Sequence, residues 1–189
     1  MPLPQFATVV RNLLAALALL FFTLPSHAAG TCAAASFVMS AGKAYDQAAR
    51  AGSAAAFANG VDRYSDMRSI ALFALGRYRS LLPKAREAEF IRLTKTFMGR
   101  FMLENGRKFR VGKLQIVECS GSGANITVTA RTASGGKVSF RIAKTGSGFT
   151  VKDMRANSIW LVQQMRSTFV GTISRNEGDI DALFKYLKR

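Results

Sequence analysis

The spacing of apolar residues changes its period twice along this chain, and this change constrains the fold more than any other feature. From residue 33 to residue 105, apolar side chains recur every three or four positions, which predicts α-helices. Over 109–155, apolar and polar residues alternate, which predicts β-strands. Helical spacing returns over 158–174 and 179–188. The chain is therefore expected to be an α+β protein, with helices before and after a sheet.

The helical region before the sheet carries start and stop signals. Ser65-Asp66 is suited to cap a helix, because short polar side chains accept hydrogen bonds from its first free backbone N–H groups. Gly76 is suited to end that helix, and Pro83 is suited to begin the next one. The helices expected from these signals and from the apolar spacing cover residues 37–48, Ser53–Tyr64, Met67–Leu75 and Pro83–Asn105.

The alternating region contains turn signals between its strands. Ser134-Gly135-Gly136 and Gly146-Ser147-Gly148 are typical of the tight turns that join antiparallel strands. The pattern predicts a curved antiparallel sheet of about four to five strands in a meander, with helices packed on its one apolar face. The expected strands are Phe109–Cys119, Ile126–Arg131, Val138–Ile142 and Phe149–Lys152.

The N-terminal segment has the order of features found in a secretory signal peptide. A basic flank ending at Arg11 precedes an apolar run, Asn12–Leu24, which is short for a helix that spans a bilayer. A proline break and Ser26-His27-Ala28 follow, with small residues in the last and third-last positions before a cleavage site. We interpret residues 1–28 as a signal peptide and residues 29–189 as a single domain exported to the periplasm. The alternative is an uncleaved membrane anchor.

Cleavage after Ala28 removes the only histidine of the chain, His27. A mature protein without histidine lacks the base of Ser-His and Cys-His hydrolases and a common zinc ligand. The densest group of carboxylates is Glu177, Asp179 and Asp181. We interpret it as the start of a helix over Ile180–Lys188, where acidic groups stabilise the helix dipole, rather than as a calcium loop. The sequence therefore predicts no enzymatic activity, no metal and no cofactor.

The chain is strongly basic, with 27 Lys and Arg side chains against 11 Asp and Glu and a formal net charge of +16. Only Arg11 belongs to the expected signal peptide, so nearly all of this charge stays on the mature protein. A charge of this size indicates an anionic partner. Export argues against nucleic acid, which leaves membrane phospholipid or an acidic protein.

Two cysteines remain in the mature chain, Cys32 and Cys119. In an exported protein an even number of cysteines favours a disulfide. A Cys32–Cys119 bridge would tie the start of the first helix to a strand, and would stabilise the fold by roughly 3–5 kcal/mol. The alternative is two unrelated thiols.

Five segments of the mature chain form a series with characteristic order and spacing. They are Val61–Leu75 with the following Gly76-Arg77-Tyr78, Pro83-x-x-Arg86-x-x-x-Phe90, Gly148-x-x-Val151-x-Asp153-Met154, Arg166-Ser167-x-Phe169 and Gly178-Asp179-Ile180-Asp181-x-Leu183. In this series the chain resembles the MlaC-type periplasmic phospholipid-binding proteins, the auxiliary family of toluene-tolerance ABC transporters. No single motif is specific, but together they span nearly the whole mature chain.

The resemblance implies a soluble periplasmic carrier that buries the acyl chains of a membrane lipid inside the protein. It also implies two partners, an ABC-type lipid transporter of the inner membrane and a lipoprotein complex of the outer membrane. Each buried CH₂ group contributes roughly 0.8 kcal/mol, so two acyl chains supply ample binding energy without any catalytic group. The lipid headgroup is then expected at the mouth, near basic side chains.

One segment departs from the family pattern. Where phospholipid carriers of this family have Gly-x-Ser-Leu after the last strand, this chain has Asn157-Ser158-Ile159-Trp160-Leu161. In this bulky segment it resembles a branch associated with hopanoids, so a hopanoid-like lipid is the alternative cargo. Equally, Trp160 is interpreted as a large core side chain of its helix.

The apolar face of the sheet either packs against a filled core or encloses a lipid cavity. The residues expected to form the walls of a cavity are Leu72, Phe73, Phe97, Phe101, Val128, Phe140, Ile142, Val151, Ile159 and Trp160. The sheet residues follow from alternation, the helical ones from their spacing, and Trp160 from the family comparison. With a filled core, the protein would instead be a non-enzymatic envelope interaction protein without lipid cargo.

Overall fold

The structure of the protein, a computed structural model, describes residues 32–105, 113–146, 148–156 and 158–189. Residues 33–189 belong to one compact unit. The expected signal peptide with its cleavage site, and the beginning of the strand expected at Phe109–Cys119, lie outside the described residues.

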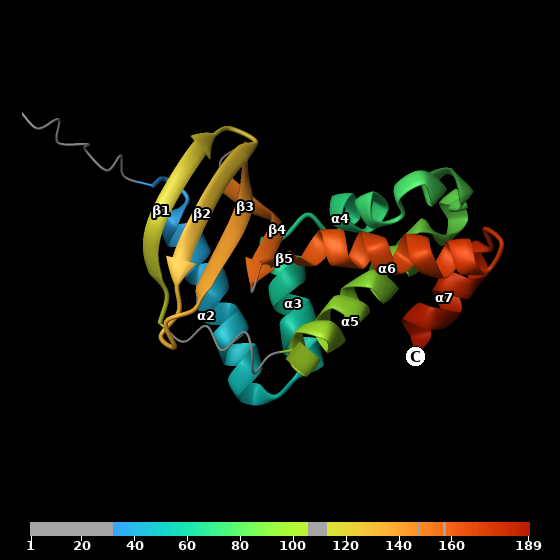
Figure 1. Cartoon of the computed structure of the whole chain (residues 1–189), viewed down its shortest axis with the longest axis horizontal. Coiled ribbons are helices and arrows are strands. Elements are labelled where there is room, and N and C mark those ends of the chain that lie inside the picture. Colours follow the sequence, from blue (N-terminus) through green and yellow to red (C-terminus); the bar gives the residue numbers. More distant parts are fainter. Residues whose placement is uncertain (1–31, 106–112, 147, 157) are drawn as a thin grey trace, which may run out of the picture. The chain divides into compact units, whose positions relative to one another are not determined.

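Helices precede and follow the strands, as the period of the sequence predicts (Figure 1). The elements before the sheet are α2 (Ala35–Ala51), α3 (Ala54–Tyr64), α4 (Met67–Ala74), the 3₁₀ helices η1 (Gly76–Leu81) and η2 (Lys84–Arg86), and α5 (Glu87–Asn105). The strands are β1 (Gln115–Ser122), β2 (Asn125–Arg131), β3 (Lys137–Thr145), β4 (Gly148–Ala156) and β5 (Ile159–Trp160). Helices α6 (Leu161–Arg175) and α7 (Ile180–Lys188) complete the described chain.

The strands form one antiparallel sheet in the order β1-β2-β3-β4-β5, which is a simple meander. The α+β class and the antiparallel curved sheet expected from the sequence are confirmed. Strand β1 ends three residues beyond Cys119, and a tight turn with Gly123 in the left-handed region (φ 58°) leads into β2. A left-handed residue of this kind matches the twist of the two strands, and glycine adopts it without a steric penalty.

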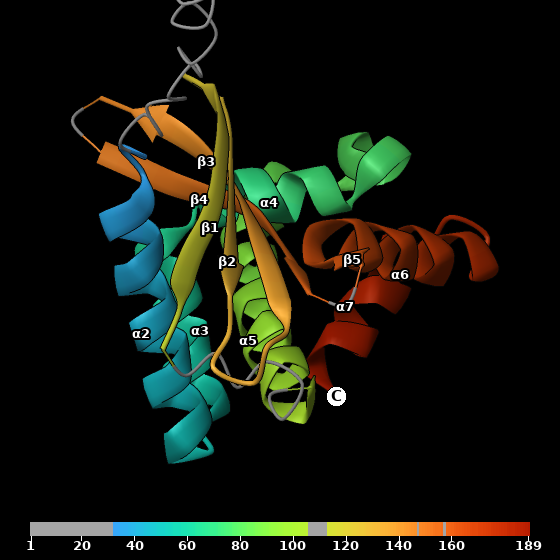
Figure 2. The ribbon, with the colours of Figure 1, turned by 60° about the vertical axis from the view of Figure 1, so that its left-hand side comes forward.

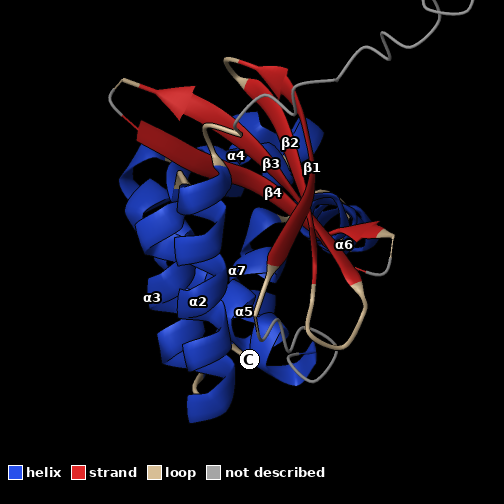
Figure 3. Ribbon diagram, turned by 90° about the vertical axis from the view of Figure 1, so that its left-hand side faces the viewer, coloured by secondary structure: helices blue, strands red, loops and turns tan. Residues whose placement is uncertain are grey.

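One face of the sheet is a continuous apolar surface. Val128 lies opposite Phe140, Ile126 lies opposite Ile142, and all four side chains are buried. Figure 2 shows α2, α3 and α5 running alongside the sheet, and in Figure 3 the strands form one layer with the helices behind and beside it. The opposite face carries Thr129, which shares a hydrogen bond with Ser139 at 3.1 Å, and the basic residues Arg131, Lys137 and Arg141.

Three helices begin with a side-chain cap, and one of these caps, Asp66, was expected from the sequence. Ser53 accepts a hydrogen bond from the backbone N–H of Ala56 at 3.1 Å, and Asp66 accepts one from Ser69 at 3.0 Å. Asp179 caps α7 through the N–H of Asp181 at 2.8 Å. The interpretation of this acidic group as a helix start therefore agrees with the structure.

Two helices begin three or more residues later than expected. Pro83 has an extended ψ of 135°, so it caps the short η2 and the α-helix begins only at Glu87. Residues 159–160 pair with Arg155 and Ala156 as strand β5, and α6 begins at Leu161 rather than at residue 158. Ser158 has a positive φ of 68°, which turns the chain back along β4. Apolar spacing alone does not reveal such a turn.

A second apolar cluster joins α5, α6 and α7 away from the sheet. The ring of Phe90 lies 6.2 Å from that of Phe169 and 5.9 Å from that of Phe184. Phe97 contacts Phe169 at 5.5 Å and Tyr186 at 5.8 Å, again between ring centroids. Aromatic rings at such distances and tilts attract one another beyond the area they bury. The last three helices therefore have a core of their own.

Helices α3 and α5 approach each other very closely at Gly99. A Cβ atom at this position would lie 2.3 Å from the carbonyl oxygen of Ala54 and 3.0 Å from the Cβ of Ala58. The absence of a side chain at Gly99 thus permits the contact, and the pair behaves as one block. In the described part of the chain, no helix combines the length and the apolar character needed to cross a membrane.

Candidate functional site

A surface cavity of about 270 Å³ lies where α4, the sheet and the start of α6 meet. We call it the α4–α6 cavity. It is lined by Ser69, Ile70, Phe73, Arg141, Lys152, Asp153, Val162 and Gln163. Apolar and basic side chains therefore share one small hollow, which suits a ligand that is itself partly apolar and partly anionic.

Two basic side chains from the sheet stand at this cavity. Arg141 on β3 is about half exposed, and its Nη1 lies 3.9 Å from Oδ2 of Asp153. Lys152 on β4 lies 3.5 Å from Oδ2 of Asp66. Both separations are longer than a good N–H···O hydrogen bond, which measures roughly 2.7–3.2 Å between the heavy atoms. Each cation therefore keeps donors for another anion.

An irregularity in the sheet sets the direction of Lys152. Arg141 pairs with Asp153 and Ile142 pairs with Val151, so Lys152 is the extra residue of a β-bulge. A bulge re-aims the side chain that it contains and is frequent near functional sites. The regular alternation read from the sequence does not predict this bulge.

Arg141 also lies against Trp160. Its guanidinium carbon is 3.9 Å from the centre of the indole ring, and that of Arg155 is 5.0 Å away. Cations attract the face of an aromatic ring, most strongly that of tryptophan. Trp160 is only half-buried at the edge of the sheet, beside Ile159, which is 57% exposed. Within the described structure, Trp160 is thus neither a buried core side chain of a helix nor part of the wall of an enclosed pocket.

Asp153 connects the sheet to the first turn of α6. The carboxylate is 5% exposed, and its Oδ1 accepts hydrogen bonds from the backbone N–H groups of Val162 at 2.9 Å and of Met154 at 2.8 Å. The residue before α6, Trp160, offers no side-chain cap. Asp153 therefore caps α6 from the neighbouring strand.

Replacing Asp153 by alanine is expected to lower the free energy of unfolding by roughly 1–3 kcal/mol, because two buried N–H groups lose their acceptor. The matched variant Asp153→Asn keeps an oxygen at Oδ1 and is expected to lose clearly less. Urea unfolding of both variants measures this difference, and equal losses would show that Asp153 acts through its charge instead.

Burial raises the pKa of the Asp153 carboxyl above its ordinary value, against the opposing effect of the two N–H groups and of Arg141. The folded protein therefore holds this proton more tightly than the unfolded chain does. The stability contributed by this group is largest below the ordinary pKa and falls as the pH rises through the folded pKa. The stability of Asp153→Asn relative to wild type is thus expected to increase with pH over this window.

Next to the α4–α6 cavity, and sharing Ile70, Asp153 and Val162 with its lining, lies a small void of about 20 Å³. It is lined by Tyr45, Val61, Ser65, Ile70, Met98, Met102, Val151, Asp153, Met154, Leu161 and Val162. A space of this size holds about one water molecule. Burial raises the pKa of the Tyr45 hydroxyl far above its usual range, so that group stays neutral. The interior between sheet and helices is therefore mainly apolar, with Asp153 as the carboxyl group in the lining of the void, and it is largely filled by side chains.

The ten residues expected to wall a cavity lie in three places. Val128, Phe140, Ile142 and Val151 are buried on the apolar face of the sheet, and Leu72 is buried on α4. Phe97 and Phe101 line a groove of about 290 Å³ between α5, α6 and α7. Phe73, at 44% exposed, lies at the α4–α6 cavity, and Ile159 and Trp160 lie at the β5 edge. The described residues do not bring the ten around one continuous space.

Sequence reasoning missed Arg141, Lys152, Met98 and Met102 as residues of the site. The two cations look like ordinary residues on the solvent face of strands, and methionines do not stand out from other apolar residues on a helix. Asp153 was singled out only as part of a motif. Neither Cys32 nor Cys119 is a free thiol in the structure, and their mutual pairing remains a prediction. Among the described residues, no group of His, Cys, Asp and Glu side chains is arranged to hold a metal ion.

The fold and the cavities define an α+β protein in which helices cover one face of an antiparallel sheet around an apolar interior. The sequence profile of the family described as MlaC protein matches residues 32–189. The chain belongs to the MlaC family.

A solved structure shares the fold. It is the phospholipid-binding protein from Ralstonia solanacearum in complex with a phospholipid, which has 18% sequence identity and a TM-score of 0.67 over 81% of this chain and 93% of that chain. At this level of identity the likeness concerns the fold. A comparison with curated proteins gave no match.

Proposed function

We propose that this protein is a periplasmic lipid carrier. It is exported by the signal peptide at residues 1–28, binds a phospholipid or a hopanoid-like lipid, and shuttles it between the inner and outer membranes. In this role it is the soluble component of an ABC-type lipid transport system and partners an inner-membrane transporter and an outer-membrane lipoprotein complex. The match of the MlaC family over residues 32–189 is the observation that carries the proposal.

The interior of the protein supports the proposal. The apolar sheet face and the helices enclose side chains with no ionised group among them except Asp153, which is held by two backbone N–H groups. Met98, Met102 and Met154 lie there together. Methionine is flexible and polarisable, and it re-packs around guests of irregular shape. Acyl chains entering this region gain roughly 0.8 kcal/mol for each buried CH₂.

The small volumes of the cavities favour a second candidate function. Pockets that bind small molecules measure roughly 300–1,000 Å³, whereas the interior void is about 20 Å³ and the α4–α6 cavity about 270 Å³. A carrier must therefore open its interior to accept a lipid. An envelope interaction protein with a solid core needs no such opening, and it is the alternative to be tested.

Native mass spectrometry of the mature protein, purified from the periplasm without detergent, is expected to show a bound lipid that organic solvent extracts. Re-adding the extracted lipid to delipidated protein is expected to raise the melting temperature, because a ligand of the folded state stabilises it by roughly 3 kcal/mol at a hundredfold excess over Kd. A melting temperature that no lipid changes, together with protein that never carries lipid, would support the solid-core alternative. The mass of the extracted species also distinguishes a phospholipid from a hopanoid.

The same preparation tests two further proposals, cleavage of the signal peptide before Ala29 and a disulfide between Cys32 and Cys119. The N-terminal sequence is expected to begin at Ala29, because small residues precede this bond. Cys32 and Cys119 are expected to be bridged to each other, so the denatured, unreduced protein should react with no thiol reagent. An intact Met1 in the membrane fraction would contradict cleavage, and two reactive thiols would contradict the bridge.

A further inference from the structure

The α4–α6 cavity and the small void next to it share a layer of lining side chains. Ile70 from α4, Asp153 from β4 and Val162 from α6 line both spaces. A movement of one or two of these side chains therefore joins the surface cavity to the apolar interior. We call this layer the inner wall of the cavity.

The basic side chains at and beside the cavity outnumber the carboxylates that are placed to form ion pairs with them. Arg141 and Lys152 line it, and Arg166 from α6 lies beside the lining residue Phe73, donating to its carbonyl at 3.3 Å with the guanidinium 4.8 Å from its ring. The facing acids are Asp66 and Asp153. Asp66 accepts hydrogen bonds from Ser69 at the start of α4, and Asp153 accepts from two N–H groups. The cavity is therefore electropositive.

Exposed apolar groups stand beside these cations. Phe73 is 44% exposed at the cavity, and Ile159 is exposed next to Trp160, whose ring lies against Arg141. A bare anion such as inorganic phosphate gains nothing from these groups. A phosphate that carries apolar chains gains from both the cations and the apolar side chains.

The elements around the inner wall differ in how firmly they are held. Helices α3 and α5 are joined by the close contact at Gly99, where no side chain intervenes. Helix α4 has eight residues and continues into the 3₁₀ helix η1 rather than into a longer α-helix. Met98 and Met102 stand on the far side of the void and adapt to new neighbours. The α4 side of the wall is thus the one suited to yield.

From this arrangement, and resting on the proposed function, we propose that the α4–α6 cavity is the entrance of the lipid site. Arg141 and Lys152 bind the phosphate of the lipid headgroup there. The acyl chains pass between Ile70 and Val162 into the methionine-lined interior.

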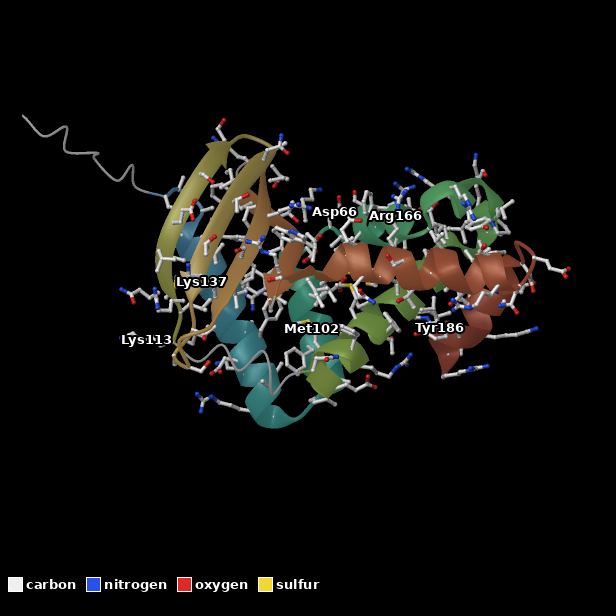
Figure 4. All side chains as sticks on the ribbon, viewed as in Figure 1. Asp66, Met102, Lys113, Lys137, Arg166 and Tyr186 are labelled. Atoms are coloured by element: carbon white, nitrogen blue, oxygen red, sulfur yellow. The ribbon has the colours of Figure 1, made fainter. Side chains whose placement is uncertain are left out.

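The headgroup part is tested with the double variant Arg141→Gln/Lys152→Gln of the delipidated mature protein. The matched control is Lys43→Gln/Lys113→Gln, because these lysines line another cavity, of about 330 Å³, beside α2; Figure 4 shows Lys113 well away from Arg166. The probes are vesicles with a fluorescent phosphatidylglycerol and vesicles with the diacylglycerol of the same chains. The first variant is expected to weaken binding of phosphatidylglycerol roughly tenfold, through loss of charge-assisted hydrogen bonds. Its binding of diacylglycerol, and all binding by the control, are expected to match wild type.

The passage is tested with two neighbouring exposed residues of α6. Gln163 lines the α4–α6 cavity, whereas Gln164 lines the groove between α5, α6 and α7. Gln163→Trp fills the entrance and is expected to slow the uptake of both lipids, while Gln164→Trp loads as wild type does. Both residues are exposed, so both variants are expected to fold, and thermal unfolding checks this.

The outcomes separate this proposal from the proposed function. Wild type that takes up neither lipid overturns both. Two other results would overturn only the assignment of the entrance while wild type still loads lipid. One is equal binding of phosphatidylglycerol by the Arg141→Gln/Lys152→Gln variant and its control. The other is slower lipid uptake by Gln164→Trp than by Gln163→Trp. Inorganic phosphate that abolishes loading at constant ionic strength shows a free-phosphate site and overturns the headgroup assignment, whereas loading that phosphate leaves intact supports it.

Discussion

Phe90→Ala is expected to lower the free energy of unfolding by roughly 3–5 kcal/mol, the range for deleting a buried phenylalanine. Phe90 has no exposed surface, and its ring contacts those of Phe169 and Phe184, so the deletion leaves a hole where α5, α6 and α7 meet. Denaturant unfolding followed by circular dichroism measures this loss.

The matched control for Phe90→Ala is Phe73→Ala. Phe73 on α4 is 44% exposed and lies against Arg166. Its removal is expected to change the free energy of unfolding by about 1 kcal/mol or less. Similar losses in the two variants would mean that the aromatic cluster of the last three helices does not contribute as the contacts indicate.

Val128→Trp is expected to destabilise the protein by roughly 1–3 kcal/mol or more, because a larger side chain forces its neighbours apart in a packed core. Val128 has no exposed surface and lies opposite Phe140 on the apolar face of the sheet. The control is Val117→Trp on β1, where the valine is 44% exposed and the same change is expected to be nearly neutral. Thermal unfolding compares the two.

The same pair of variants also reports on cargo. If lipid enters between the sheet and the helices, Val128→Trp is expected to retain less lipid than Val117→Trp. A Val128→Trp protein that is as stable as wild type would indicate an open space behind the sheet, contrary to the packed interior of the structure. A destabilised Val128→Trp combined with wild type that never carries lipid would favour the solid-core alternative.

The order of elements was predictable because the apolar spacing changes its period where the sheet begins and ends. The structure adds that several residues of the family motifs form junctions between elements. Arg86 pairs with Glu89 and with Asp181 at the start of α7, and its guanidinium lies 3.6 Å from the ring of Phe184. Asp153 joins β4 to α6. These residues belong to the segments on which the family resemblance rests. The motifs are therefore informative about fold, because their side chains fix how distant segments meet.

The arrangement of the site was less predictable, and the reason is geometric. Alternation places Lys152 on a fixed side of a regular strand, but the bulge in β4 changes the direction of its side chain. Residues 159–160 continue the apolar spacing of α6, yet the positive φ of Ser158 turns them into a strand. Spacing also shows which face of an element is apolar but not which elements face one another. Phe97 and Val128 therefore seemed to share one wall, although they belong to different clusters.

If the protein carries lipid as proposed, its filled interior has a consequence for the empty protein that returns from the destination. A permanently open cavity would leave a wide wet apolar surface on the unloaded protein and would favour self-association. Here the methionines and the sheet face leave a cavity of only about 20 Å³ between them, so little of that apolar surface is open to water. Opening the interior costs free energy, so the apparent affinity equals the affinity of the open form multiplied by the fraction of molecules that are open. A moderate affinity of this kind allows the same protein both to take up a lipid and to hand it on.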